Sequence, residues 1–400
     1  AGETSATDFL VENLTNGTGY HFTVTATDTS NFEGPFSEVV FATPSYNGPN
    51  WWVDPNQSQD GDGSFASPFN SIRRAVSEIA QRGDTIRIAA GNFSDGGINF
   101  SRDPNQSSSN DTSNSGPIKE IVIIGAGPNN TIINAENNRH FNFVDKDLEK
   151  VLVSGMTLTN AYSESNGGSI YVDNVDSVTF TNIIFDENRA KMGGGAIVLS
   201  AVKYSAFSNV VFNRNYIDVS ENSTGQGAAI KAFENPDGGY GNITIANCKF
   251  IENGITAVSN NAAGRGSAIF VDGAFGLHIS QSEFKRNNID SRSFASSLIA
   301  VYYNDSVPLW SDFPPFIIDR SLFEDNMIYS SVDVGDSFLS TNRPLYFVNN
   351  LVVNNFVPNN NNAYQMILMS GPADQGGNAA TSFIESNTFY GNSGNNAFMD

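Results

Sequence analysis

The sequence predicts an all-β fold, a right-handed parallel β-helix in which short strands wind into coils stacked along one axis. The first observation is a repeat: large apolar residues, here called anchors, recur from residue 158 to residue 389, and the residue five positions before each anchor is also apolar. The second is an asparagine three residues after most anchors, as expected at a corner with a left-handed backbone. The third is that no copy has the length or period of a helix. A repeat that keeps one register indicates a solenoid.

The anchors form a column that we expect inside the coils as a ladder. They are Leu158, Phe185, Phe212, Phe250, Phe284, Phe323, Val353 and Phe389. The asparagines three residues later are Asn188, Asn215, Asn253, Asn287, Asn326 and Asn392, and the other two copies have Ala161 and Phe356 there. Three residues before the anchors stand Asn182, Asn209, Asn247 and Asn350, with Gln281 similar and Gly155, Arg320 and Ser386 different. Because stacked coils let an asparagine bond to its equivalent one coil away, we expect these columns to be scaffold.

A second motif precedes four of the anchors. Residues 167–170, 194–197, 227–230 and 266–269 read GGSI, GGAI, GAAI and GSAI, and their small residues favour tight turns. Residues 185–188 (FDEN) and 194–197 (GGAI) resemble the FxxN and GGAI repeats of polymorphic outer-membrane proteins, a family of bacterial surface adhesins. The resemblance implies a protein displayed at the bacterial cell surface or secreted.

The segment ahead of the repeats differs in character. In residues 1–44, strands are expected at 7–11, 20–27 and 37–43 from their alternation and β-branched content. Leu14, Gly17 and Tyr20 match the tyrosine corner of fibronectin type III domains, and residues 42–44 (ATP) match the usual exit. The resemblance implies the C-terminal part of such a domain, and hence a fragment of a larger multidomain polypeptide. A β-appendage packed on the rod is the alternative. Residues 45–50 read as a linker.

Residues 51–400 are assigned to the β-helix, with residues 51–93 as its entry segment. An aromatic-Val-Asp opening at 52–54, a Gly/Asp loop at 60–63 and the run SPFNSI at 67–72 precede a strand at 84–90. This stretch resembles the entry segment of bacterial pectate-lyase-like β-helix proteins. The helix within it has an apolar face formed by Ile72, Ala75, Val76 and Ile79. We expect this helix to start after Asn70 or Ser71, to end at Gly83 and to cap the open first coil.

The amino-acid composition limits the classes of binding partner. Lys and Arg number 21 against 42 Asp and Glu, which gives a formal net charge of −21. This balance argues against nucleic acid and against an anionic membrane surface, and it leaves carboxylates free to meet calcium. No run is long or apolar enough to cross a bilayer. Cys248 is the only cysteine, and its place two residues before an anchor predicts a core residue rather than a reactive thiol.

Three outward residues are candidates for sugar binding. Tyr171, Lys231 and Phe270 each follow the isoleucine of the second motif, so they share one outward strand position in different coils. Aromatic and cationic groups on one strand face could stack on a sugar and bind it. The alternative is an ordinary strand surface, or one covered by a long loop.

A calcium site is a further candidate. Asp60 and Asp62 resemble a calcium loop in their spacing, although Ser58 holds the first position and no Glu follows at the twelfth. A plain Asp/Gly turn is the alternative reading.

No catalytic set is evident in the sequence. A lyase on this fold needs carboxylates for calcium with a Lys or Arg base, and a glycoside hydrolase needs carboxylates that flank one bond. Asp173 and Asp272 share a position in their coils, but two coils intervene. The catalytic residues of such an enzyme would therefore lie in the variable loops, such as residues 221–225, 233–241 and 304–315.

These observations favour a secreted or surface-displayed bacterial protein with an adhesin-like, non-catalytic β-helical stalk. Its expected partners are extracellular polysaccharides or cell-surface components. The alternative is a calcium-dependent polysaccharide lyase or glycoside hydrolase, and a structural filament or sheath subunit is the third reading.

Overall fold

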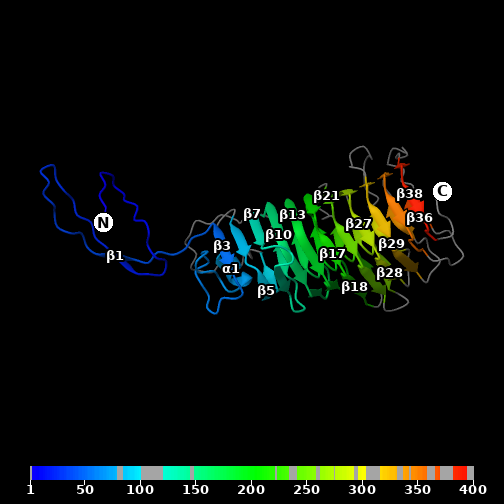
Figure 1. Ribbon diagram of the computed structural model, residues 1–400, viewed down its shortest axis with the longest axis horizontal. Helices are drawn as coiled ribbons and strands as arrows, with labels where there is room; N and C mark the ends of the chain where they lie inside the picture. The colour runs from blue at the N-terminus through cyan, green and yellow to red at the C-terminus, as the bar shows by residue number, and fades with distance from the viewer. Residues whose placement is uncertain are drawn as a thin grey trace.

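The computed structural model describes residues 2–78, 84–100, 120–144, 148–220, 223–233, 241–257, 262–273, 275–291, 296–302, 316–330, 337–341, 344–357, 365–369 and 382–393. From β3 (Asn50–Val53) onward these residues form a rod of stacked coils (Figure 1). Each strand of a coil pairs in parallel with its equivalent in the next coil, for example β12 (Ile170–Asp173) with β15 (Ile197–Ser200). The predicted parallel β-helix is confirmed.

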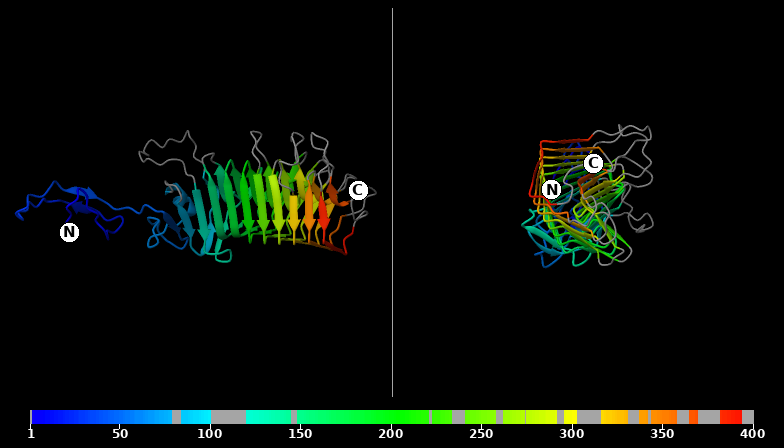
Figure 2. Two further views of the ribbon diagram at one scale, coloured as in Figure 1. Left: turned by 90° about the horizontal axis from the view of Figure 1, so that it is seen from above. Right: turned by 90° about the vertical axis from the view of Figure 1, so that its right-hand side faces the viewer.

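One long sheet bends across each coil and supplies two sides of the rod (Figure 2). Its first arm contains β3, β4 (Thr85–Ile88), β7 (Glu120–Gly125), β10 (Lys150–Thr159), β13 (Ser177–Asp186), β16 (Tyr204–Ser208), β21 (Gly241–Ala246), β26 (Phe275–Ser280), β30 (Phe316–Asp319), β34 (Leu345–Val348) and β37 (Phe383–Glu385). Its second arm contains β5 (Gly91–Ser94), β8 (Thr131–Asn134), β17 (Val211–Asn213), β22 (Lys249–Ile251), β27 (Glu283–Lys285), β31 (Leu322–Glu324), β35 (Leu351–Val353) and β38 (Thr388–Tyr390). The ten-residue strands β10 and β13 run through both arms.

Two further sheets complete the coil. The shorter contains β11 (Tyr162–Ser163), β14 (Arg189–Ala190), β18 (Tyr216–Val219), β23 (Gly254–Ala257), β28 (Asn288–Ser291) and β32 (Met327–Ser330). The longer contains β6 (Ile98–Asn99), β9 (Phe141–Val144), β12, β15, β20 (Ile230–Phe233), β25 (Ile269–Asp272), β29 (Ser297–Tyr302), β33 (Ser337–Thr341) and β36 (Gln365–Met369). A small extra pair joins β19 (Thr224–Gln226) to β24 (Ala263–Arg265).

Aromatic anchors fill the interior of the rod. They are fully buried, and their rings stack from coil to coil with centroids 4.5 to 5.2 Å apart. The stack is Phe185, Phe212, Phe250, Phe284 and Phe323. This is the predicted ladder, and the spacing of the rings follows from strands that are themselves one inter-strand distance apart.

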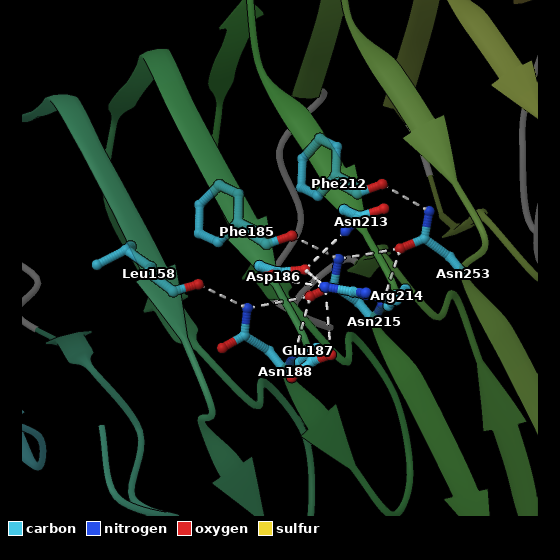
Figure 3. A network of polar contacts seen from close by, with 10 residues as sticks. All are labelled: Leu158, Phe185, Asp186, Glu187, Asn188, Phe212, Asn213, Arg214, Asn215 and Asn253. Atoms are coloured by element: carbon cyan, nitrogen blue, oxygen red, sulfur yellow. Dashed lines mark hydrogen bonds and ion pairs between the residues drawn. The ribbon is translucent and has the colours of Figure 1, made fainter. Parts of the chain in front are cut away.

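The asparagine ladder runs beside this stack. Asn188, Asn215, Asn253, Asn287 and Asn326 are buried, and the side-chain amide of each donates to the Oδ1 atom of the asparagine one coil on. The same amide also donates to the main-chain carbonyl of the anchor one coil back, as Asn215 does to Phe185 (Figure 3). These hydrogen bonds link consecutive coils inside the rod, as a structural role for the asparagines requires.

The seventh copy corrects the predicted register by one residue. Phe323 pairs with Val352, which is fully buried, and not with Val353. The run LVV at 351–353 offers two adjacent branched residues for one inward position, so the sequence alone left the choice between them open.

This shift restores the asparagine column. Asn355 accepts hydrogen bonds from Asn326 and donates to Asn392, so the expected exception at Phe356 was wrong. The residue three before the anchor is likewise Asn349 rather than Asn350, and Asn350 instead donates to Asn387 in a second, shorter ladder.

Helix α1 (Ile72–Glu78) packs against β3, β4 and β6 at the N-terminal end of the rod. Ser71 caps it by accepting a hydrogen bond from the Arg74 main-chain N–H at 3.3 Å, and Ile72 and Ala75 are buried. The predicted capping helix is confirmed, whereas Ile79 and Gly83 lie outside the described residues. Among the described residues no helix is long and apolar enough to cross a membrane.

Ahead of the rod, β1 (Tyr20–Phe22) and β2 (Val40–Ala42) form a two-stranded antiparallel sheet. The strand expected at 7–11 is not formed, and Leu10 there is 78% exposed, since no neighbouring strand pairs with it. The Tyr20 hydroxyl accepts a hydrogen bond from the Thr15 main-chain N–H at 2.9 Å, a contact that fits a tyrosine corner. The assignment of residues 1–44 to a fibronectin type III domain stays a prediction.

Candidate functional site

The three sugar-binding candidates lie in one row on the outer side of the nine-stranded sheet. Strand pairing aligns Tyr171 with Val198, Val198 with Lys231, and Lys231 with Phe270. Their neighbours along the strand, such as Ile170, point into the core. Tyr171 and Lys231 are thus separated by one coil, and Lys231 and Phe270 are adjacent. We call these four residues the outward row.

The outward row is covered to different degrees. Val198 is fully buried and Phe270 is 2% exposed, with its ring 6.0 Å from that of Tyr302. Tyr171 and Lys231 are half-buried. The accessible chemistry of the row is therefore the phenol and the amine, and the Phe270 ring contributes packing.

Lys231 reaches back across the preceding coil. Its Nζ atom donates to Asn166 Oδ1 at 3.1 Å and lies 5.2 Å from the centre of the Phe233 ring. Gly193 makes this reach feasible, because a Cβ atom there would stand 2.3 Å from Lys231 Cδ and 3.0 Å from Asn166 Oδ1. Burial lowers the pKa of Lys231 to about 8, although Asp272 acts in the opposite direction.

Arg139 lies at the other end of the group formed by Lys231 and Asn166. Its guanidinium donates to the carbonyls of Gly167 at 2.7 Å and Asn166 at 2.6 Å, and lies 5.2 Å from the centre of the Tyr171 ring. Burial lowers the pKa of Arg139 and raises that of Tyr171. Lys231, Asn166, Arg139 and Tyr171 together form a preorganised polar cluster.

The sequence signalled only part of this cluster. Arg139 and Asn166 precede their strands in turns and belong to no repeated column, so periodicity could not identify them. The glycine that makes room for Lys231 had no signal beyond its place next to the GGAI motif.

Asp173 and Asp272 do not assemble into a catalytic pair. Asp173 and Asp272 occupy one row with Ser200 and Phe233 between them, as expected from the sequence. Within the described residues no group of three or more His, Cys, Asp or Glu side chains is placed to hold a metal ion. Residues 304–315 and most of 233–241, where catalytic residues were expected if present, lie outside the described residues.

Asp60 and Asp62 form polar contacts within their own loop and with the neighbouring helix. Asp60 forms an ion pair with Arg74 at 3.0 Å and accepts from the Asn70 main-chain N–H, while Asp62 accepts from the Ser64 main-chain N–H at 3.0 Å. Calcium at this loop stays a prediction, and the ion pair to Arg74 already balances the charge of Asp60.

Three solved structures to which the chain is similar are pectin methylesterases. Pectin methylesterase PemA from Erwinia chrysanthemi has a TM-score of 0.36 and 12% sequence identity, over 88% of this chain and 92% of that chain. Two pectin methylesterase structures in complex with hexasaccharides, one of a mutant, have TM-scores of 0.38 and 0.36 at the same identity and coverage. Such values carry no activity over to this chain. Neither a protein-family model nor a curated protein sequence matches it.

Proposed function

We propose that this protein is a β-helical stalk of the bacterial surface or extracellular space that contacts a polysaccharide through the cluster around Tyr171 and Lys231. The observation that carries the proposal is one cluster on an outer sheet face that holds the phenol of Tyr171 against a guanidinium and the amine of Lys231 against the Asn166 amide, with the Asp272 carboxylate one coil further on. Coils repeat about every 4.8 Å, so Tyr171 and Lys231 lie two coil steps, or roughly 10 Å, apart along the rod, and a chain of sugars lying along the rod can contact both.

The charge of Lys231 favours acidic sugars as the ligand. Because the pKa of Lys231 is about 8, its amine is charged below that pH and neutral above it. Binding of a uronate-containing polysaccharide should therefore weaken as pH rises through 8, and binding of a neutral polysaccharide should not.

A panel of acidic and neutral polysaccharides, each with and without calcium, tests the proposal. We expect Lys231→Met to weaken binding of an acidic polysaccharide by about tenfold, the usual effect of losing one charge-assisted hydrogen bond. Lys203→Met is the matched control, because Lys203 is exposed and pairs with Asp176 elsewhere on the rod. Equal affinity of Lys231→Met and the wild-type protein for every acidic member would refute the proposal.

A lyase is the second candidate, and the lowered pKa of Lys231 favours it. A neutral amine could take the proton on the carbon next to a uronate carboxylate. The bond from the neighbouring carbon to the glycosidic oxygen would then break, leaving a carbon–carbon double bond, while the departing oxygen takes up a proton. Turnover should rise as pH approaches 8, opposite to binding, and Lys231→Met should abolish it.

The absorbance of unsaturated products, followed during the same panel, separates the two candidates. Product formation that depends on Lys231 would replace the stalk reading by the enzyme reading. Neither binding nor turnover on any member would leave a structural filament or sheath subunit as the better account.

A further inference from the structure

An open hollow lies at the bend of the long sheet, on a different sheet from the outward row. Its volume is about 490 Å³, within the range of small-molecule sites. The turn after β7, including Pro128, forms one wall, and bend residues of β10, β13 and the β16–β17 connection form the floor.

The wall of the hollow is held rigidly. The Gly127 main-chain N–H donates to the Gly155 carbonyl at 2.8 Å, and the Thr157 hydroxyl donates to the Pro128 carbonyl at 2.6 Å. Gly155 must be a glycine or the turn would move, because a Cβ atom on it would lie 2.7 Å from the Gly125 carbonyl oxygen. The hollow is therefore preformed rather than created by a mobile loop.

The floor presents two amides and two aliphatic side chains. Asn182 and Asn209 are exposed, and both have a left-handed backbone with φ of 53° and 54°. In the described part of the chain, neither side-chain amide has a hydrogen-bond partner. Ile184 and Val211, each two residues further along the chain, pair in register with each other and are half-buried.

We propose that this hollow binds a neutral saccharide unit. No charged side chain lines it, in a chain with a net charge of −21, so neither an anion nor a cation finds a counter-charge there. Two free primary amides, each able to donate and accept, suit the alternating hydroxyls of a sugar. The aliphatic floor suits the C–H groups of its ring. This site is independent of the polysaccharide contact at Lys231.

The test uses substitutions that preserve the left-handed backbone conformation. Glycine already occupies this left-handed position as Gly155, so Asn182→Gly together with Asn209→Gly removes both amides without backbone strain. Asn247→Gly is the matched control, because Asn247 holds the same position, with φ of 53°, one coil beyond the hollow. Binding of short neutral oligosaccharides, with uronate oligosaccharides for comparison, is measured by titration calorimetry.

We expect at least one neutral oligosaccharide to bind to the wild-type protein. The double variant should bind it at least about tenfold more weakly. The Asn247→Gly and Lys231→Met variants should bind it with the affinity of the wild type. Denaturation midpoints verify that the variants are folded. Absence of binding by every neutral oligosaccharide, or equal losses in the double variant and the Asn247→Gly control, would overturn the site while leaving the proposal for Lys231 untouched.

Discussion

At the scale of single residues, the ladder shows why asparagine occupies the buried corner. Asn253 Oδ1 accepts hydrogen bonds from the main-chain and side-chain N–H groups of Asn215 at 3.0 and 2.9 Å. Its amide donates to the Phe212 carbonyl at 2.9 Å and to Asn287 Oδ1 at 3.0 Å. Every polar atom of the side chain is used, which aspartate could not achieve because an ionised carboxylate has no donor.

Asn253→Ala should lower the free energy of unfolding by about 3 kcal/mol or more, because it leaves several buried donors and acceptors unpaired at about 1–3 kcal/mol each. The urea midpoint measures the effect. Asn242→Ala in the same coil is the control, since Asn242 is exposed. Similar midpoints for the two variants would show that the ladder is not a source of stability.

His140 makes the rod sensitive to acid. It is fully buried between the Ser169 hydroxyl and the Ile133 carbonyl, at 2.9 Å from each, and burial lowers its pKa from 6.5 to about 4. The carbonyl requires a proton on Nε2, so Nδ1 accepts from Ser169 and the ring is neutral. The unfolded chain protonates this ring first, so stability is complete above pH 6.5 and falls as pH drops from 6.5 to 4.

The loss amounts to about 3 kcal/mol over that interval, at 1.36 kcal/mol per pKa unit. In His140→Gln, which keeps a donor and an acceptor, the decrease in unfolding free energy between pH 7.5 and pH 4.5 should be smaller than in the wild type. Urea titrations at the two pH values give the comparison. An identical pH dependence would assign the acid sensitivity to other groups.

At the scale of elements, the coils are defined by two columns of left-handed residues. The column three before the anchors has φ between 48° and 70° throughout, at Gly155, Asn182, Asn209, Asn247, Gln281, Arg320, Asn349 and Ser386. The column two after the anchors has φ between 51° and 65°, at Asn160, Glu187, Arg214, Glu252, Arg286, Asp325, Asn354 and Gly391. The backbone therefore keeps its bend even where the residue type changes.

Gln281 tests this column because its side chain is less suited to a left-handed backbone than asparagine. Gln281→Asn should raise the free energy of unfolding by about 0.5–1 kcal/mol, and Gln281→Val should lower it by about 1–2 kcal/mol. Thermal denaturation of both variants provides the measurement. Shifts of the same sign would mean that side-chain contacts, rather than backbone conformation, dominate at this bend.

These columns also show how much of the structure could be predicted from the sequence. Inward positions accept only apolar or ladder-forming residues, so Phe185 to Phe323 and their asparagines were predictable. The second left-handed column was not, because Glu187, Arg214 and Glu252 carry no signal for a positive φ. The polar cluster depended on Arg139 and Asn166, whose positions are set by turns that bring distant segments together.

At the scale of the whole molecule, the described residues comprise a rod with a buried interior and an N-terminal segment whose apolar side chains are exposed. Val24 and Phe36 are more than 70% exposed, and Phe41 is 61% exposed. A two-stranded sheet cannot bury such residues itself.

The rod itself offers a long, regular surface, and we propose that its ligand binds at Lys231. The most direct test is the acylation of individual lysines by an amine-reactive ester, quantified by mass spectrometry, with and without a saturating acidic polysaccharide. We expect the polysaccharide to slow labelling of Lys231 several-fold and to leave labelling of Lys203 unchanged. Equal labelling of Lys231 in the presence of a bound polysaccharide would contradict it.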